Sequence, residues 1–344
     1  MAELNGKATL VATDAATEGR RTAATGSGQV SLRAARLDRA PGMARSEVPR
    51  ESTARSRPVI ERVSGPEGFS WNIEPYATCA FECVGCPVEV PGVSEGRGHA
   101  QAHAVLLARL RDMAARGDRT LGAHPVVLGA HADPWQPAER ALGRTRQILE
   151  ALVAVPELSV VVRTRSSLVG RDADVLGQLA RRGRVRVTVV LPTLSRRLWS
   201  LLEPASPSPE RRLMAVGILA RAGLEVGVEV GPLIHGVNDD DSALRRLLSR
   251  ARDAGAGGAS FRALPSAERG RDGWLSQVAA RHPDRAAALG RLASHARSHG
   301  DPGAAALAHR FSALCAEVGL ANGAGAFGSG AHRVANPPRQ LSLF

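Results

Sequence analysis

From about residue 68 onward, short apolar runs alternate with longer stretches that have the periodicity of a helix. Six such units are predicted, and their strands are FSWNIEPY, HPVVLGAH, LSVVVRT, VRVTVVLP, LEVGVEVGPLI and GASFRAL. Strands that alternate with crossover helices run parallel and are joined by right-handed connections. Several of the strands are continuous β-branched runs, which is typical of strands buried on both faces. The sequence therefore predicts an α/β fold with a parallel sheet.

Two architectures accommodate this alternation, and the pattern by itself leaves both open. The units can form a partial (β/α)6 barrel, or they can form an open doubly wound sheet. In either architecture the chemistry belongs at the carboxyl ends of the strands. We predict a tail at residues 1–60, the partial barrel at 61–265, a helical extension at 266–335 and a C-terminal tail at 336–344.

Residues 1–60 lack the apolar pattern of the rest of the chain. They are rich in Ala, Thr, Gly, Ser and Arg, and they contain no Phe, Trp, Tyr or Cys. Such a segment buries too little apolar surface to offset the entropy lost on ordering. We therefore predict a disordered basic tail.

The sequence contains no signal for a membrane. No apolar run approaches the ~20 residues that a bilayer span needs, and the N-terminus has no hydrophobic signal core. We expect a cytoplasmic protein without a membrane partner. In a reducing cytosol, clustered cysteines more often serve metals or redox chemistry than structural disulfides.

The stretch CAFECVGC follows the first predicted strand and contains Cys79, Cys83 and Cys86 in the spacing C-x3-C-x2-C. A structural zinc site needs four ligands, so a zinc ion here would need a histidine. Four histidines could supply it: His99, His103, His124 and His131. Three thiolates in one short loop instead suit three corners of a cubane [4Fe–4S] cluster and leave one iron open for another ligand.

This cysteine spacing, after the first strand of a β/α partial barrel, resembles the radical S-adenosylmethionine superfamily. Further segments resemble, in chain order, its branch related to spore photoproduct lyase, a DNA photoproduct repair enzyme. The segments are EPYATCAFECVGC, LGAHADPWQP, RTRSSLVGRDADVL, LLEPASPSPERRL, GPLIHGVND and PPRQLSLF. The resemblance covers roughly residues 58–344.

The resemblance implies both the cofactors and the chemistry. Cys79, Cys83 and Cys86 would hold the [4Fe–4S] cluster, and its open iron would chelate the amino and carboxylate groups of S-adenosylmethionine. An electron from the reduced cluster would cleave S-adenosylmethionine to a 5′-deoxyadenosyl radical, which abstracts hydrogen from a substrate. We expect an electron donor such as flavodoxin or ferredoxin. The fold implied is a partial barrel of the radical S-adenosylmethionine type.

Four further residues lie where this superfamily contacts the cofactor. Asp133 and Gln136 follow the second strand, where the superfamily binds the amino group or ribose, although a loop turn with a helix cap explains them equally well. Arg165 and Ser166 follow the third strand and could meet a carboxylate or phosphate. Arg165 matches a lysine in relatives, and its alternative is a solvated loop arginine.

Two other positions have a structural and a functional interpretation. Glu203 and Arg211 flank PASPSP, where a helix N-terminus could bind an anion or where the two could form a surface ion pair. Cys315 has Phe311, Leu314 and Val318 around it at helical spacing. We predict that Cys315 is a buried small hydrophobic residue rather than a reactive thiol.

The charge and the C-terminus suggest partners. A formal net charge of +12 favours polyanionic partners, although a solvated basic surface explains it equally well. The final QLSLF resembles the peptide by which bacterial proteins dock onto the DNA polymerase sliding clamp. In that interpretation Gln340 is the polar anchor and Leu341, Leu343 and Phe344 fill an apolar pocket; otherwise the tail folds back onto its own barrel.

Together these features predict a radical S-adenosylmethionine enzyme of the lyase or transferase class. The substrate class that we expect is nucleic acid, with DNA repair or modification as the process, and a nucleotide or a peptide is the alternative. The competing hypothesis is a non-catalytic iron–sulfur or zinc-binding module in DNA-associated interactions. Gly85 favours the competing hypothesis, because the superfamily usually has an aromatic residue before the third cysteine.

Overall fold

A computed structural model describes part of the chain. The described residues are 59–65, 68–81, 83–84, 86, 97–263, 276, 278–280, 282–297 and 303–322. The chain divides into two compact units, Met1–Arg50 and Glu51–Phe344, and every described residue belongs to the second. Most of the predicted tail and the predicted clamp-docking peptide Gln340 to Phe344 lie outside the described residues, so both stay predictions.

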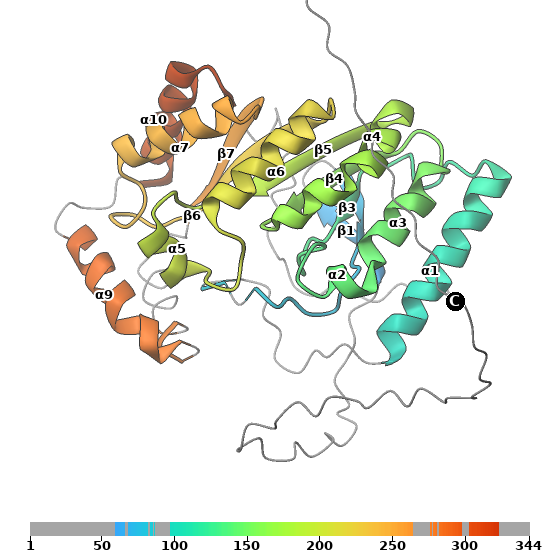
Figure 1. Ribbon diagram of the computed structural model, residues 1–344, viewed down its shortest axis with the longest axis horizontal. Coiled ribbons are helices and arrows are strands. Elements are labelled where there is room, and N and C mark those ends of the chain that lie inside the picture. Colours follow the sequence, from blue (N-terminus) through green and yellow to red (C-terminus); the bar gives the residue numbers. More distant parts are fainter. Residues whose placement is uncertain are drawn as a thin grey trace, which may run out of the picture. The chain divides into compact units, whose positions relative to one another are not determined.

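The described strands form one eight-stranded sheet (Figure 1). The strands are β1 (Ile60–Gly65), β2 (Gly68–Ile73), β3 (Val126–Leu128), β4 (Ser159–Thr164), β5 (Arg184–Val190), β6 (Glu225–Leu233), β7 (Gly258–Ala263) and β8 (Ala321–Asn322). The helices are α1 (Arg97–Arg116), α2 (Glu139–Leu142), α3 (Arg144–Val153), the 3-10 helix η1 (Ser167–Asp172), α4 (Ala173–Arg182), α5 (Arg196–Leu202), α6 (Pro209–Arg221), α7 (Asp241–Asp253), α9 (Pro283–Arg297) and α10 (Gly303–Val318).

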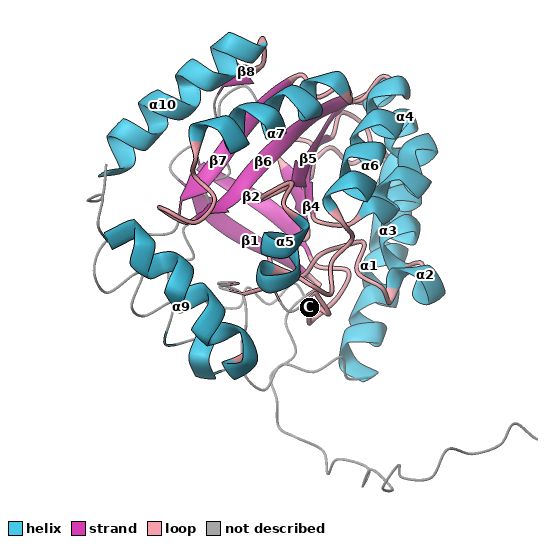
Figure 2. Cartoon of the chain, turned by 60° about the vertical axis from the view of Figure 1, so that its left-hand side comes forward, coloured by secondary structure: helices cyan, strands magenta, loops and turns pink. Residues whose placement is uncertain are grey.

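The order of the strands decides between the two predicted architectures. From β1 to β8 the strands lie side by side in chain order. A doubly wound sheet reverses its order at a switch point, and this sheet has no reversal. Right-handed crossovers that always advance in one direction place their helices on one face, as Figure 2 shows for α1, α3, α4, α6 and α7. The strands β2 to β7 are the six predicted parallel strands, and β1 does not pair with β8, so the prediction of a partial barrel is confirmed.

Strand alternation gives the sheet two chemically different faces. In β4, Val160 and Val162 are buried in the core beneath the helices. Arg163, the next residue along the strand, points to the other face. In β6, Val226 and Val228 alternate with Glu229 in the same way. We call the face opposite the helices the inner face. Polar side chains on this face include Glu61, Asn72, Glu74, Arg163, Arg184, Arg186, Thr188, Glu225, Glu229 and Arg262.

Two edge strands differ from the sequence prediction. The strand β1 pairs antiparallel with β2, and β8 pairs parallel with β7. The sequence IERVSG of β1 has no clean apolar alternation, and β8 is only two residues long. Neither segment has the alternation of apolar residues that predicts a strand from sequence. Each is a strand because it pairs with a neighbour in the sheet, β1 with β2 and β8 with β7.

The C-terminal helix α10 packs into the core of the sheet. Phe311 of α10 lies against Phe261 of β7, with ring centroids 4.9 Å apart. Cys315 is 0% exposed in the same core, and burial raises the pKa of its thiol to about 12. Its environment is that of a small buried hydrophobic residue, as predicted. No helix among the described residues has the length and apolar character needed to cross a bilayer.

Candidate active site

The three clustered cysteines lie on the loop that leaves the carboxyl end of β2. Cys79, Cys83 and Cys86 are free and partly exposed. The loop turns on itself through the hydrogen bond from Cys86 N to Cys83 O, at 3.1 Å. It is fixed to the end of α5 because Val84 N donates to Leu202 O at 2.7 Å. The thiols are thus held at the edge of the sheet where the chemistry of this fold belongs.

Burial governs the protonation of these thiols. It raises the pKa of Cys79 to about 11 and the pKa of Cys83 to about 12. The charge of Cys86 raises both further, so the thiols are close enough to affect one another. A bound metal cation would offset the free-energy cost of the buried thiolate charges, because a thiol that coordinates a metal is deprotonated. The donor set of thiols on one loop therefore fits an iron–sulfur cluster, although no three described His, Cys, Asp or Glu side chains already have a metal-holding arrangement.

The histidines considered for a zinc site have other partners. His99 Nε2 lies 3.2 Å from Pro75 O, and His103 Nε2 lies 3.3 Å from Arg144 O. His131 Nδ1 lies 2.8 Å from Glu74 Oε1. Each of these rings has one nitrogen engaged away from the thiols. Within the described residues, no histidine completes a metal-holding group with them.

Gln136 clamps the cysteine loop on either side of Cys79. Its Nε2 donates to Thr78 O at 2.7 Å, and its Oε1 accepts from Ala80 N at 2.8 Å. The side chain is 3% exposed, so both ends of the amide are used by the loop. Gln136 therefore positions the thiol-bearing backbone. The prediction that it contacts the cofactor directly stays a prediction.

Replacing Gln136 with alanine should accelerate loss of the reconstituted cluster to a chelator by about tenfold or more, as is typical when a group that orients metal ligands is removed. The physical reason is that both hydrogen bonds flanking Cys79 disappear. The rate of decay of the cluster's visible absorbance measures the effect. Gln147→Ala is the matched control, because its amide donates only to Leu142 O on an exposed helix end. Equal decay rates for both variants would contradict the clamp.

Asp133 ties the end of β3 to the end of β4. Its Oδ1 accepts from Trp135 N at 3.0 Å and from Thr164 Oγ1 at 2.7 Å, and its Oδ2 accepts from Arg165 N at 2.6 Å. Burial raises the pKa of this carboxyl, and the hydrogen bonds partly offset that shift. Asp133 therefore fixes the backbone of Arg165 at the end of β4.

Arg165 brings positive charge to the thiols. Its Nε donates to Glu203 Oε2 at 3.0 Å. Burial lowers the pKa of Arg165, but the negative charges of Cys83 and Glu203 outweigh burial, so the net shift is upward. Ser166 has a different role, because its Oγ accepts from Leu168 N and caps η1. Both ionisable residues among the four predicted cofactor residues interact with the thiols, because Cys83 raises the pKa of Arg165 and the charge of Asp133 raises the pKa of Cys79.

No protein family profile matches the chain. It is 30% identical over 160 residues to the uncharacterized protein Rv2578c of Mycobacterium tuberculosis, covering 46% of each chain. It is 25% identical over 172 residues to the uncharacterized protein MJ0683 of Methanocaldococcus jannaschii, covering 50% of this chain and 63% of the relative. The chain thus spans about half the length of the Mycobacterium relative.

Two kinds of solved structure overlap with the fold. Spore photoproduct lyase, solved with bound AdoMet and dinucleoside spore photoproduct, overlaps with a TM-score of 0.38, 17% identity and 51% of each chain. OxsB, a cobalamin-dependent S-adenosylmethionine radical enzyme, overlaps with a TM-score of 0.38, 12% identity, 62% of this chain and 30% of its own. Each overlap is partial and has low sequence identity. The resemblance to the radical S-adenosylmethionine superfamily therefore rests on the cysteine spacing and the ordered sequence segments.

In this fold, Glu203 pairs with Arg212 and not with the predicted Arg211. Arg212 Nη1 lies 2.6 Å from Glu203 Oε1, and the Arg212 side chain is 0% exposed. Arg211 is exposed at the start of α6. Neighbouring residues on a helix point about 100° apart, so only one of the two arginines can face the core. The expected surface pair is therefore a buried one.

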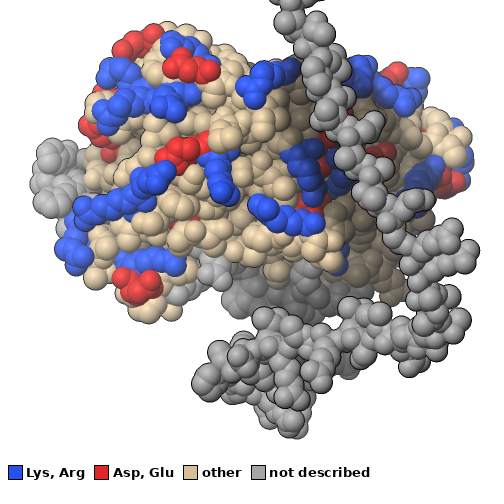
Figure 3. All heavy atoms as spheres, in the orientation of Figure 1, with Lys and Arg blue, Asp and Glu red and all other residues tan. Residues whose placement is uncertain are grey.

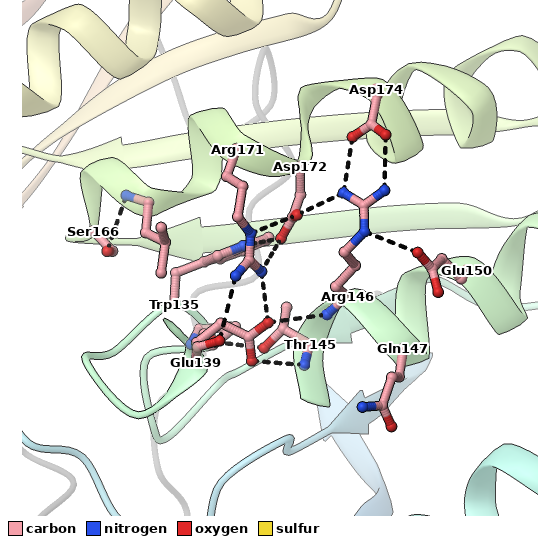
Figure 4. A network of polar contacts seen from close by, with 12 residues as sticks. Trp135, Glu139, Thr145, Arg146, Gln147, Glu150, Ser166, Arg171, Asp172 and Asp174 are labelled. Carbon is pink, nitrogen blue, oxygen red and sulfur yellow. Dashed lines mark hydrogen bonds and ion pairs between the residues drawn. The ribbon is translucent and has the colours of Figure 1, made fainter. Parts of the chain in front are cut away.

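A second polar network, centred on Glu139 and Asp172, lies next to the segment that leads into the cysteine loop (Figure 4). Glu139, the first residue of α2, is fully buried and accepts from Tyr76 Oη at 2.5 Å and from Arg171 Nη2 at 2.7 Å. Arg171 also donates to Asp172, whose Oδ2 accepts from Trp135 Nε1 at 2.7 Å. Figure 4 shows Arg171 between Glu139 and Asp172. The network holds Tyr76, just before the thiols, and Trp135, just before the clamp residue.

Polar groups on the inner face were not predicted from the sequence. Glu74 is fully buried and its Oε1 accepts from His131 N at 2.7 Å and from Asn72 Nδ2 at 2.9 Å. On the other half of this face, Arg163 pairs with Glu229. Charged residues that alternate with valine, as in EVGVEVG, are the signal that could have located them.

Proposed function

We propose that this protein is a radical S-adenosylmethionine enzyme in which Cys79, Cys83 and Cys86 hold a [4Fe–4S] cluster. One observation carries the proposal: three free thiols share a single loop at the carboxyl end of the first parallel strand of a singly wound sheet. When bound and reduced by a flavodoxin- or ferredoxin-type donor, the cluster supplies the electron that cleaves S-adenosylmethionine to a 5′-deoxyadenosyl radical.

The residues of the chain would position the reactants. Gln136 holds the backbone around Cys79, and Asp133 holds the backbone of Arg165. Arg165 places a guanidinium beside Cys83, where it can offset the negative charge of thiolate ligands and meet a cofactor carboxylate. The inner face would keep the substrate near the radical and away from water.

Nucleic acid is the substrate class that we propose, in DNA repair or modification. The net charge of +12 supports it, because a basic protein attracts polyanions. Over the face seen in Figure 3, basic side chains are spread out with acidic ones among them. The reaction class, lyase or transferase, and a cytoplasmic location belong to the same proposal.

Anaerobic reconstitution with iron, sulfide, S-adenosylmethionine and dithionite tests the proposed chemistry. We expect formation of 5′-deoxyadenosine, detected by chromatography and mass spectrometry. An intact cluster that never cleaves S-adenosylmethionine would favour the non-catalytic module. Protein isolated anaerobically with zinc and a fourth ligand from the chain would overturn the proposal, and metal analysis of the same sample reports this.

A further inference from the structure

Two arginines on the inner face share one carboxylate. Arg163 of β4 reaches across β5 and donates to Glu229 of β6 twice, from Nε to Oε2 at 2.7 Å and from Nη2 to Oε1 at 2.5 Å. Arg262 of β7 donates from Nε to Glu229 Oε1 at 3.3 Å. The Glu229 side chain is 13% exposed, whereas those of Arg163 and Arg262 are 35% and 39% exposed. The carboxylate is therefore covered, and both guanidinium groups still reach solvent on the inner face.

This half of the inner face carries excess positive charge. Arg163 and Arg262 share Glu229 on this face, and Arg165 at the end of β4 shares Glu203 with the buried Arg212 of α6. These four guanidinium groups thus have two carboxylates between them. Thiolates of a bound cluster would offset the charge of Arg165, because the charges of Arg165 and Cys83 interact. The excess then remains at Arg163 and Arg262.

The acidic side chains of the inner face differ between its two halves, because Glu225 and Glu229 of β6 are each paired with two arginines. Glu74 of the β2 end and Glu61 of β1 approach His131 Nδ1, at 2.8 Å and 3.5 Å. A negatively charged ligand is therefore repelled from β1 and β2 and attracted to β4, β6 and β7. The charge distribution gives a bound anion both a place and an orientation.

Packing and charge at Arg262 support this assignment. Gly231 follows Val230 in β6, and a Cβ at Gly231 would lie 2.9 Å from Glu229 Oε1 and 3.1 Å from Arg262 Cβ. Glycine is therefore what allows the carboxylate and the arginine to approach each other. Burial lowers the pKa of Arg262, and the charges of Arg163 and Arg165 lower it further, against the opposing effect of Glu229.

We propose that Arg163 and Arg262 bind a phosphate group of the substrate, and that Glu229 competes with this phosphate for their N–H donors. The proposal rests on the proposed function, since it names the substrate contact on the same inner face. Guanidinium groups pair with phosphate oxygens through parallel N–H donors, and two of them on different strands can serve separate oxygens of one phosphate. A carboxylate has only two oxygens, so it can accept fewer hydrogen bonds from the two guanidinium groups than a phosphate can.

Binding of a short fluorescein-labelled single-stranded DNA, measured by anisotropy over a series of salt concentrations, tests this site on the full-length reconstituted protein. Arg163→Gln and Arg262→Gln should each weaken binding by about tenfold, the loss of one charge-assisted contact. Each should also reduce the slope of log affinity against log salt by about 0.7. Glu229→Gln should have the opposite effect and tighten binding, because it removes the carboxylate that competes with phosphate.

Arg245→Gln is the matched control, because Arg245 pairs with Glu317 on the outer helices and should leave binding unchanged. Inorganic phosphate should compete with the DNA, and acetate at equal ionic strength should not. The proposal is overturned if the Arg163 and Arg262 variants bind as the wild type does, if Glu229→Gln weakens binding as they do, or if acetate competes equally well. Thermal melting reports whether each variant is folded. Release of 5′-deoxyadenosine by the wild type without DNA is measured separately, so failure of the radical chemistry is distinguished from failure of this site.

Discussion

Alanine in place of Cys79, Cys83 or Cys86 should reduce 5′-deoxyadenosine formation to background, and each variant should reconstitute with little iron and sulfide. The reason is that a cubane needs three protein thiolates to leave one open iron, and two thiolates leave a second iron without a protein ligand. Iron and sulfide analysis and the product assay measure the effect on the same sample.

Cys315→Ala is the control for these variants. Cys315 is 0% exposed in the core between α10 and the sheet, far in sequence from the cysteine loop. Its replacement should leave iron and sulfide content unchanged and cost only the modest stability of a small core truncation. The assignment of the thiols is wrong if any single variant of the three loop cysteines keeps a full cluster, or if Cys315→Ala loses it.

Glu203→Ala should lower the free energy of unfolding by about 3–5 kcal/mol, the usual cost of leaving a buried charge without its partner. Arg212 is 0% exposed and would keep only its hydrogen bonds to neutral groups, Pro207 O at 2.9 Å, Val190 O at 2.8 Å and the hydroxyl of Ser206. Arg165 would lose the carboxylate that holds its Nε. Urea denaturation followed by circular dichroism measures the change.

The control for this prediction is Glu210→Ala on the surface of α6. Glu210 pairs with Arg196 at 3.2 Å, and the two side chains are 46% and 78% exposed. Exposed pairs contribute at most about 1 kcal/mol, so the control should be close to wild type. Similar losses for the two variants would show that the Glu203 pair is no more important than a surface one.

The cysteine loop illustrates how far sequence reasoning reaches for the site. Cys79, Cys83 and Cys86 are close enough in the chain that their spacing alone predicts one shared site for a metal ion or an iron–sulfur cluster. Gln136 was predicted near the cofactor, and the structure places it at the loop, where its amide bonds to the backbone on both sides of Cys79. A side chain 58 residues away from Thr78 carries no local signal for that contact.

Ion pairing shows the limit of the sequence most clearly. Arg163 and Glu229 are 66 residues apart in the chain. Glu203 forms its ion pair with Arg212 and not with the neighbouring Arg211. Alternation predicts that charged residues share one face of a strand, but it does not say which strand lies opposite. Only the order β4, β5, β6, β7 decides that Arg163 and Arg262 reach the same carboxylate.

The sequence by itself determined the parallel α/β class, the six strands β2 to β7 and the thiol-bearing loop, because periodicity and short spacing are local properties of the chain. The tertiary structure alone decided that the sheet is wound in one direction, that β1 and β8 form its edges, and which carboxylates the arginines share. These features depend on residues that meet only after the strands have assembled, and nothing in the local pattern records which distant partner each residue will meet.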